Sequence, residues 1–272
     1  MKTKNYLSLF FLLLGTAITH AGVPQPMCIF YGQAKNGFGW PYTSSADVVL
    51  RVGTNEYARS TISGSLKPGV NFALYVHLDD GNGTAYSPHA LHSGDSIKII
   101  VIDEYGEKTI METNAIPAVG QPGETILVNV TAGTDSDHDG LPDEWEKKLL
   151  ESGTQTSILD IHPNDDFDGD GVSNWKEYLA GTIAYMANDY FFIENQEITP
   201  NGRLRLEYLS VPGKIYWVES TTNLSENIWI TAPFATSDEG SLRTAPLIGD
   251  GNWQYLYLPL TGPSRQFKLK VQ

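Results

Sequence analysis

The segment DSDHDGLPDEWE, residues 135–146, limits what this chain can fold into more than any other stretch. It concentrates carboxylates that repel one another unless a cation or solvent screens them. The pattern returns at residues 166–177 as DFDGDGVSNWKE. Both stretches align with a twelve-position calcium loop, in which oxygen ligands come from positions 1, 3, 5, 7, 9 and 12 and a glycine at position 6 permits a sharp bend. The sequence therefore predicts two cation-binding loops.

The expected ligands are of the same kinds in both loops. Positions 1, 3, 5 and 9 supply side-chain oxygens, position 7 supplies a backbone carbonyl, and the glutamate at position 12 closes the shell with two oxygens. Magnesium demands a tighter octahedron, and zinc is usually bound by Cys and His, so we expect Ca²⁺ as the cofactor. The predicted ligands are Asp135, Asp137, Asp139, Leu141, Asp143 and Glu146 in the first loop, and Asp166, Asp168, Asp170, Val172, Asn174 and Glu177 in the second.

Both loops depart from a paired EF-hand at position 8, which is normally apolar and bonds across to the twin loop. It is Pro142 in the first loop, which has no N–H to donate, and Ser173 in the second. Short helices are expected after the loops, over 142–152 and 173–180, with a glycine just beyond each, but none before them. We therefore expect loop–helix half-motifs without cooperative sensor behaviour.

Acidic residues dominate the chain, with 32 Asp and Glu against 18 Lys and Arg and a formal charge of −14. Thirteen of these acids but only three lysines lie in residues 135–177, so this segment carries −10. Such a balance argues against nucleic acid as a partner, and against anionic membrane surfaces. The alternative to a cation site is a pair of solvated acidic loops.

Short, β-branched and partly alternating stretches lie on both sides of the loops, separated by turns rich in Gly, Pro, Asp and Asn. The expected strands are 47–52, 73–78, 97–102, 125–130, 203–209, 214–220, 254–260 and 266–272. The expected fold class is therefore mainly β, with two antiparallel β-sandwich-like domains joined by a short loop–helix calcium-binding segment. The expected boundaries are 22–133 for the N-terminal β-sandwich domain, 134–187 for the tandem calcium-loop segment and 188–272 for the small C-terminal β domain.

The first residues, 1–21, are typical of a secretory signal peptide. Lys2 and Lys4 precede an apolar run, 7–18, that is too short to span a bilayer, and small residues surround Ala21. We expect cleavage near Ala21 and a secreted protein (extracellular, at the cell surface or periplasmic) with no transmembrane segment in the mature chain; a membrane anchor is the alternative. Cys28 is the single cysteine, so no internal disulfide can form. A bound metal is the usual alternative means of stabilising a secreted chain.

DSDHDGLPDEWE followed by DFDGDGVSNWKEYLAGT resembles the tandem DxDxDG calcium segments of many secreted bacterial proteins, which are similar to thrombospondin type 3 repeats and EF-hand-like loops. VPGKIYWVESTTNL, residues 211–224, with Trp229 and the closing QFKLKV, is similar to a small β module that follows such segments. FYGQAKNGFGWP through LRVGTNEYARSTI resembles β-sandwich modules of the same proteins. Dockerin modules also have two loop–helix units, although their loops tend to end in Asp with longer helices. The resemblance implies calcium and secretion.

No sequence motif for catalysis is found: there is no G-x-S-x-G, no P-loop and no dinucleotide fingerprint. We therefore expect no catalytic residues and a non-enzymatic, calcium-ordered protein. A module that binds an extracellular polysaccharide or protein is the main alternative, and a hydrolase with paired carboxylates is another. A group of histidines and acids is interpreted as hairpin-turn chemistry around DDGNG rather than a metal site. The group is His77, Asp79, Asp80, His89 and His92.

Aromatic residues recur in both flanking regions and would suit sugar rings if they stood on an exposed face. At alternate strand positions they are more often core residues, which is the expectation here. They are Phe38, Trp40, Tyr42, Tyr216, Trp217, Trp253, Tyr255 and Tyr257.

Overall fold

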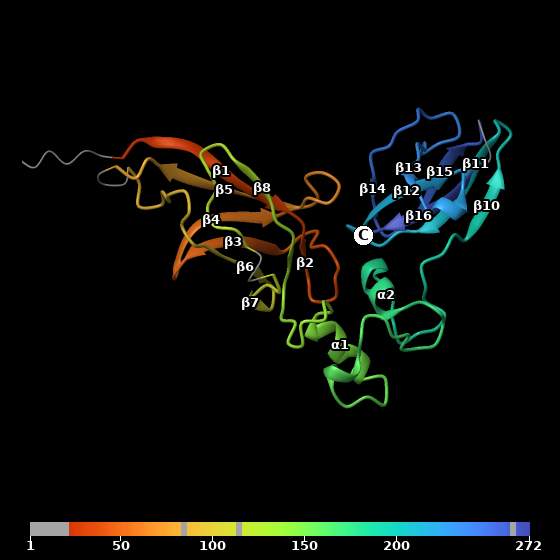
Figure 1. Cartoon of the computed structure of the whole chain (residues 1–272), viewed down its shortest axis with the longest axis horizontal. Coiled ribbons are helices and arrows are strands. Elements are labelled where there is room, and N and C mark those ends of the chain that lie inside the picture. Colours follow the sequence, from red (N-terminus) through yellow and green to blue (C-terminus); the bar gives the residue numbers. More distant parts are fainter. Residues whose placement is uncertain (1–21, 83–85, 113–115, 262–264) are drawn as a thin grey trace, which may run out of the picture.

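The computed structural model describes residues 22–272 except 83–85, 113–115 and 262–264, so the expected signal peptide, 1–21, lies outside the described residues. The predicted mainly β class is confirmed. Figure 1 shows two groups of strands, with the two α-helices below and between them. Within the described part of the chain, no helix has the length and apolar character needed to cross a membrane.

The first strand group precedes the acidic loops and forms two main sheets. One is antiparallel with the order β4-β3-β6-β7, and the other has the order β5-β1-β8. Side chains alternate along β5, where Leu74 and Val76 are fully buried and Tyr75 is exposed, as a strand with one core face requires. Cys28 is buried in the same core, and burial raises the pKa of its thiol. The strands are β1 (Pro24–Gly32), β2 (Ala34–Lys35), β3 (Ala46–Val52), β4 (Asn55–Ile62), β5 (Phe72–Asp79), β6 (Lys98–Asp103), β7 (Gly106–Lys108), β8 (Thr125–Leu127) and β9 (Val130–Thr131).

One expected strand of this group, 125–130, is wrong as a single element. It divides into β8 and β9, which pair in parallel with β1 and β2 respectively, whereas all pairs were expected to be antiparallel. The break falls where the chain crosses Gly32 so closely that a Cβ there would lie 1.9 Å from the Val128 carbonyl oxygen. The Asn129 side chain then accepts a hydrogen bond from the Gln33 N–H at 3.0 Å.

The second strand group follows the loops, and all its pairs are antiparallel. The strands expected at 203–209, 214–220, 254–260 and 266–272 are confirmed as β11, β12, β15 and β16 to within a residue or so. Tyr208, Tyr216 and Phe234 are the largest side chains of its core. The strands are β10 (Asn195–Ile198), β11 (Arg203–Leu209), β12 (Ile215–Thr221), β13 (Ile230–Thr231), β14 (Leu247–Ile248), β15 (Trp253–Pro259) and β16 (Gln266–Val271), with a 3-10 turn, η2 (Leu224–Glu226).

Both expected helices are present between the strand groups, as α1 (Asp143–Leu150) and α2 (Asn174–Ala180), and a 3-10 turn, η1 (Ile158–Asp160), precedes the second loop. Each helix starts directly after position 8 of its loop. The helices meet in a small apolar cluster in which the rings of Trp145 and Tyr178 lie 6.0 Å apart, edge to face. This packing, rather than strand pairing, joins the two loops.

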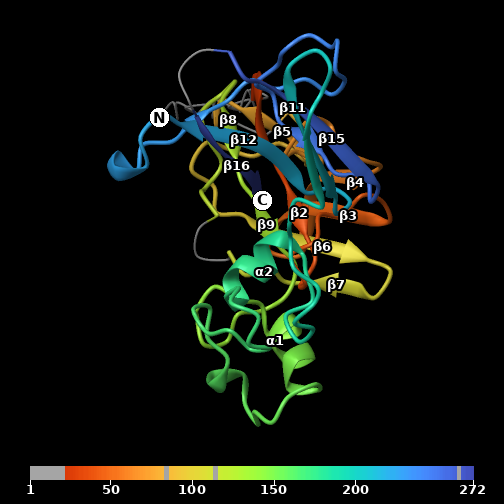
Figure 2. The same ribbon diagram turned by 90° about the vertical axis from the view of Figure 1, so that its right-hand side faces the viewer.

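Residues from both strand groups hold this segment in place. Gly39, at φ 75°, lies so close to α2 that a Cβ would be 2.5 Å from the Tyr178 ring. From the second strand group, the buried Lys214 ammonium donates to the carbonyls of Leu179 (2.7 Å) and Tyr178 (3.3 Å) at the end of α2. Burial, and then the charge of Lys35, lower the pKa of Lys214 to about 7. Figure 2 shows both helices at the same end of the molecule.

Replacing Gly39 by alanine is expected to weaken the seating of α2. The methyl group would meet the Tyr178 ring, and alanine is strained at positive φ, so we expect a loss of about 1–3 kcal/mol of unfolding free energy in chemical denaturation. Gly53→Ala is the matched control, because Gly53 has φ 61° but nothing within 4 Å of a Cβ. Equal losses in the two variants would contradict the close approach.

Candidate metal centre

The two acidic loops fold with the same backbone geometry. Position 4 is left-handed in both, with φ 64° at His138 and 79° at Gly169. Position 6 has φ 100° at Gly140 and 94° at Gly171, a conformation that glycine adopts without steric cost. His138 is exposed. The chain therefore makes the same tight curl twice, in two different surroundings.

Backbone N–H groups hold the first carboxylate of each loop. Those of positions 4 and 6 donate to Asp135 at 2.7 and 3.1 Å, and to Asp166 at 2.8 and 2.7 Å. At position 5, Asp139 and Asp170 each accept the N–H of position 7, at 2.9 and 2.7 Å. The second oxygen of Asp139 and that of Asp170 are buried and accept no hydrogen bond from the described residues.

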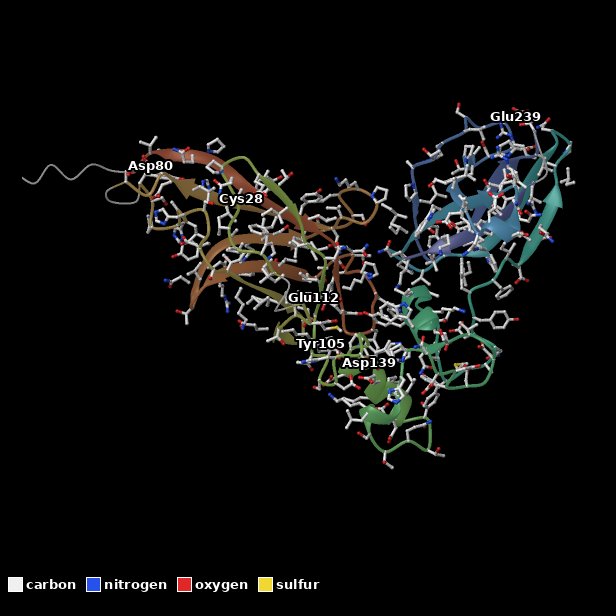
Figure 3. The ribbon with its side chains drawn as sticks, in the orientation of Figure 1. Cys28, Asp80, Tyr105, Glu112, Asp139 and Glu239 are labelled. Atoms are coloured by element: carbon white, nitrogen blue, oxygen red, sulfur yellow. The ribbon has the colours of Figure 1, made fainter. Side chains whose placement is uncertain are left out.

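Three aspartates of each loop converge. One carboxylate oxygen from each member lies within 4.8 Å of the others, so each triplet could hold a metal ion. Figure 3 labels Asp139 beside the two helices. The triplets are Asp135, Asp137 and Asp139 in the first loop, and Asp166, Asp168 and Asp170 in the second.

The glutamate at position 12 lies in the first turn of the helix that follows each loop and is not among the carboxylates of the converging triplet. Glu146 and Glu177 are 0 % exposed, yet neither oxygen of either side chain has a hydrogen-bond partner among the described residues. Buried polar groups in folded proteins are paired in the great majority of cases, and an orphan carboxylate points to an ion or water. Four aspartate oxygens of the loops are buried and unpartnered in the same way: Asp137 Oδ1, Asp139 Oδ2, Asp168 Oδ2 and Asp170 Oδ2.

Burial and mutual repulsion make these carboxylates reluctant to ionise. Burial, followed by the charges of the neighbouring aspartates, raises the pKa of Glu146 to about 8 and that of Glu177 to about 8. Burial also raises the pKa of Asp139 and of Asp168. A divalent cation among them would remove the repulsion and favour the ionised forms.

Position 9 has a different environment from the other predicted ligands. Asp143 accepts hydrogen bonds from the Ser136 N–H (2.7 Å), the Ser136 hydroxyl (2.8 Å) and the Thr134 hydroxyl (3.0 Å). Asn174 takes the equivalent bond from the Phe167 N–H at 3.1 Å. Both side chains therefore tie the start of their loop to the helix, and their direct ligation of a cation stays a prediction, as does that of the Leu141 and Val172 carbonyls.

Replacing Asp143 by alanine is expected to destabilise the protein with or without a bound cation. Burial alone would raise the pKa of Asp143, but its hydrogen bonds to Ser136, Thr134 and Lys147 lower it to about 2. Losing them leaves buried donors unpaired, and we expect a cost of about 1–3 kcal/mol in chemical denaturation in chelator. Glu151→Ala, in the exposed end of the same segment, should cost little. An Asp143 variant that loses stability only when a cation is present would contradict this role.

The histidine and acid group around DDGNG has the bonds expected of a turn. Asp79 accepts the Gly81 N–H at 2.9 Å, and Asp80 accepts the Asn82 N–H at 3.1 Å. His92 Nε2 lies 2.7 Å from Asp79 Oδ1. The turn accounts for both aspartates, and the pairing with His92 adds a contact that the sequence did not predict.

A second acidic group, which uses none of the predicted ligands, lies in a hollow of about 440 Å³ beside Trp40. The Lys108 ammonium is 3.5 Å from Asp103 and 3.7 Å from Glu144, and the Tyr42 hydroxyl donates to Asp103 at 2.8 Å. The lysine links the two carboxylates and ties α1 to β6 and β7. Nothing in the spacing of these residues along the sequence predicts that they meet.

The expectation that the aromatic residues are core is wrong for several of them. Tyr216 is buried in the core, but Trp40 and Trp253 are each 47 % exposed and Tyr255 is 38 % exposed. On β15 the inward positions are taken by Leu256 and Leu258, so the aromatic residues of that strand lie on the outer face.

In its chemistry, the candidate centre is a duplicated set of oxygen donors. The two clusters among the described residues that could hold a metal ion contain neither His nor Cys. Hard oxygen donors in such numbers suit hard divalent cations. No protein-family model, no curated protein and no solved structure matches the chain.

Proposed function

We propose that the chain is a secreted, non-enzymatic calcium-binding protein in which two Ca²⁺ ions order residues 134–187 between β domains formed by 22–133 and 188–272. The observation that carries the proposal is the duplicated set of buried carboxylate oxygens without hydrogen-bond partners in the described part of the chain, above all those of Glu146 and Glu177. Secretion rests on the signal-like residues 1–21 and on the resemblance to secreted proteins with tandem DxDxDG segments.

The number and kind of oxygens favour calcium over other cations. Each loop offers one oxygen from each of its three aspartates, two from its glutamate and the carbonyl at position 7, and position 9 is often linked through water. Such a set suits the 6–8 oxygens of calcium, whereas magnesium retains several waters and prefers one or two carboxylates.

Calcium would supply order that the segment lacks by itself. The helices have only 8 and 7 residues, too few to be stable alone. Two Ca²⁺ ions would change the charge of 135–177 from −10 to −6. Extracellular modules of this type bind calcium at roughly 10⁻⁴–10⁻³ M, so calcium outside the cell suffices.

Calorimetric titration of the chelator-stripped full chain tests the proposal. We expect two bound Ca²⁺, one in Glu146→Gln, one in Glu177→Gln and none in the double variant, because each substitution removes the two-oxygen ligand of one loop. Glu151→Gln, in the same acidic segment but with an exposed side chain, should still bind two ions. The proposal fails if calcium produces no binding heat, or if the Glu151 variant behaves like the others.

A further inference from the structure

An open hollow of about 490 Å³ lies where the first strand group, the end of α2 and the second strand group meet. Aromatic residues from three separate segments line it, namely Trp40, the run Tyr190–Phe192, and Trp253 at the start of β15. Its size is within the range of small-molecule sites, roughly 300–1,000 Å³. It takes no part in the cation-binding loops.

These aromatic side chains are displayed rather than buried. Trp40, Trp253, Phe192 and Tyr190 are 47 %, 47 %, 46 % and 43 % exposed. Phe191, between two of them, instead packs into the core, with its ring centroid 5.7 Å from that of Tyr216. Alternation along this segment therefore anchors one ring and leaves its neighbours in solvent. Clustered exposed aromatic surface marks a binding site more often than isolated apolar residues do.

The charged side chains that line the hollow are carboxylates, which accept hydrogen bonds, beside the hydroxyls of Thr182 and Ser210. Asp189 and Glu194 line it, and Asp189 accepts the Ile183 N–H through Oδ2 at 2.8 Å, which leaves its other oxygen for a ligand. None of the described residues that line the hollow is Lys or Arg. The site is therefore acidic and aromatic. It would repel phosphates, nucleic acids and anionic polysaccharides, and it suits a ligand that combines C–H faces with O–H donors.

We propose that this hollow binds a neutral polysaccharide. Pyranose rings with mainly equatorial hydroxyls present C–H faces that pack against aromatic rings, here Trp40 and Trp253, while pairs of their hydroxyls donate to Asp189 and Glu194. This proposal goes beyond calcium binding. It rests on the proposed function only because part of the lining belongs to the segment that calcium would order. Gly181, which lines it, ends α2 four residues after Glu177.

Isothermal titration of the calcium-loaded full chain with cellohexaose, laminarihexaose, mannohexaose and xylohexaose tests the proposal. We expect at least one of these oligosaccharides to bind, and Trp253→Ala and Tyr190→Ala each to weaken binding by about tenfold or more. Trp229→Ala is the matched control, because Trp229 lies against Lys268, outside the hollow, and should leave binding unchanged. Glu194→Gln should weaken binding without altering the melting temperature.

Three outcomes would overturn the proposal. In the first, none of the four oligosaccharides binds although calcium titration still shows two ions. In the second, an oligosaccharide binds but Trp253→Ala and Tyr190→Ala leave its affinity unchanged. In the third, the chain self-associates at the hollow, so that Trp253→Ala converts a dimer to a monomer. Calcium binding is measured separately in every variant, so a failure of the sugar site is distinguished from a failure of the calcium loops.

Discussion

Calcium is expected to raise the melting temperature of the chelator-stripped protein by about 5–20 °C. At roughly 10 mM calcium and a dissociation constant of about 10⁻⁴–10⁻³ M, each site contributes about 1.4–2.7 kcal/mol. For a chain of this size each kcal/mol corresponds to about 2–4 °C. The effect should be largest in the transition reported by Trp145 fluorescence, because this buried ring lies in the cluster that joins the two helices.

The Glu146→Gln, Glu177→Gln double variant provides the control for this shift. Its curve should not respond to calcium, and in chelator at neutral pH it should melt no lower than the unsubstituted protein, since glutamine is neutral without the proton that each buried glutamate must take up. Magnesium at the same concentration should give a smaller shift. If chelator leaves the curve of the unsubstituted protein unchanged, the loops do not stabilise it through calcium.

Without calcium, the stability of the protein is expected to fall as pH rises, and calcium should weaken this dependence. The pKa values of Glu146 and Glu177 are raised from 4.5 to about 8 in the folded protein. Between these values the folded chain holds protons that the unfolded chain has released, so the stability that these groups contribute is full below about pH 4.5 and is lost as pH rises through about 8. The chelated protein should therefore melt higher at pH 5.5 than at pH 8.

Calcium should weaken this dependence because it binds only the ionised carboxylates, so protons compete with it. We expect the calcium-induced shift in melting temperature to grow from pH 5.5 to pH 8, with a difference in unfolding free energy on the order of a few kcal/mol. Asp143 acts in the opposite direction, but only near its own lowered pKa of about 2 and thus outside this window. The double Glu→Gln variant should show neither dependence, and a calcium-induced shift that shrinks as pH rises would contradict the assignment.

The candidate centre could be predicted from the sequence because its parts are local. All predicted ligands of a loop lie within twelve residues, and the spacing alone places Asp135, Asp137 and Asp139 together. Whether the side chain at position 9 contacts a cation or its own backbone could not be predicted in this way. The carboxylate of Asp143 could point to a cation or back to the chain, and the donors Ser136, in the loop, and Thr134, directly before it, compete for it.

The fold was predictable where one strand face is buried and the other is not. Alternation identified β11, β12, β15 and β16, although it did not show which face carried the aromatic residues, because on β15 leucines take the core positions. Parallel pairing of β1 with β8 depends on segments far apart in the chain, and β1 begins with prolines that hide its strand character. The meeting of Trp40 with Gly181 and Trp253 likewise has no local signal.

Because Lys214 caps α2, the geometry of the second loop depends on two segments that are far apart in the chain. This helix of 7 residues, roughly 10 Å long, carries Glu177 in its first half and ends at the carbonyls that the ammonium binds. Thermodynamic reciprocity then requires that a cation which steadies the helix strengthens the lysine contact, and that the contact strengthens cation binding by the same factor. The lysines in the last turn of α1, Lys147 and Lys148, instead donate to Asp143 and Glu151, so we expect the two loops to differ in their affinity for a cation.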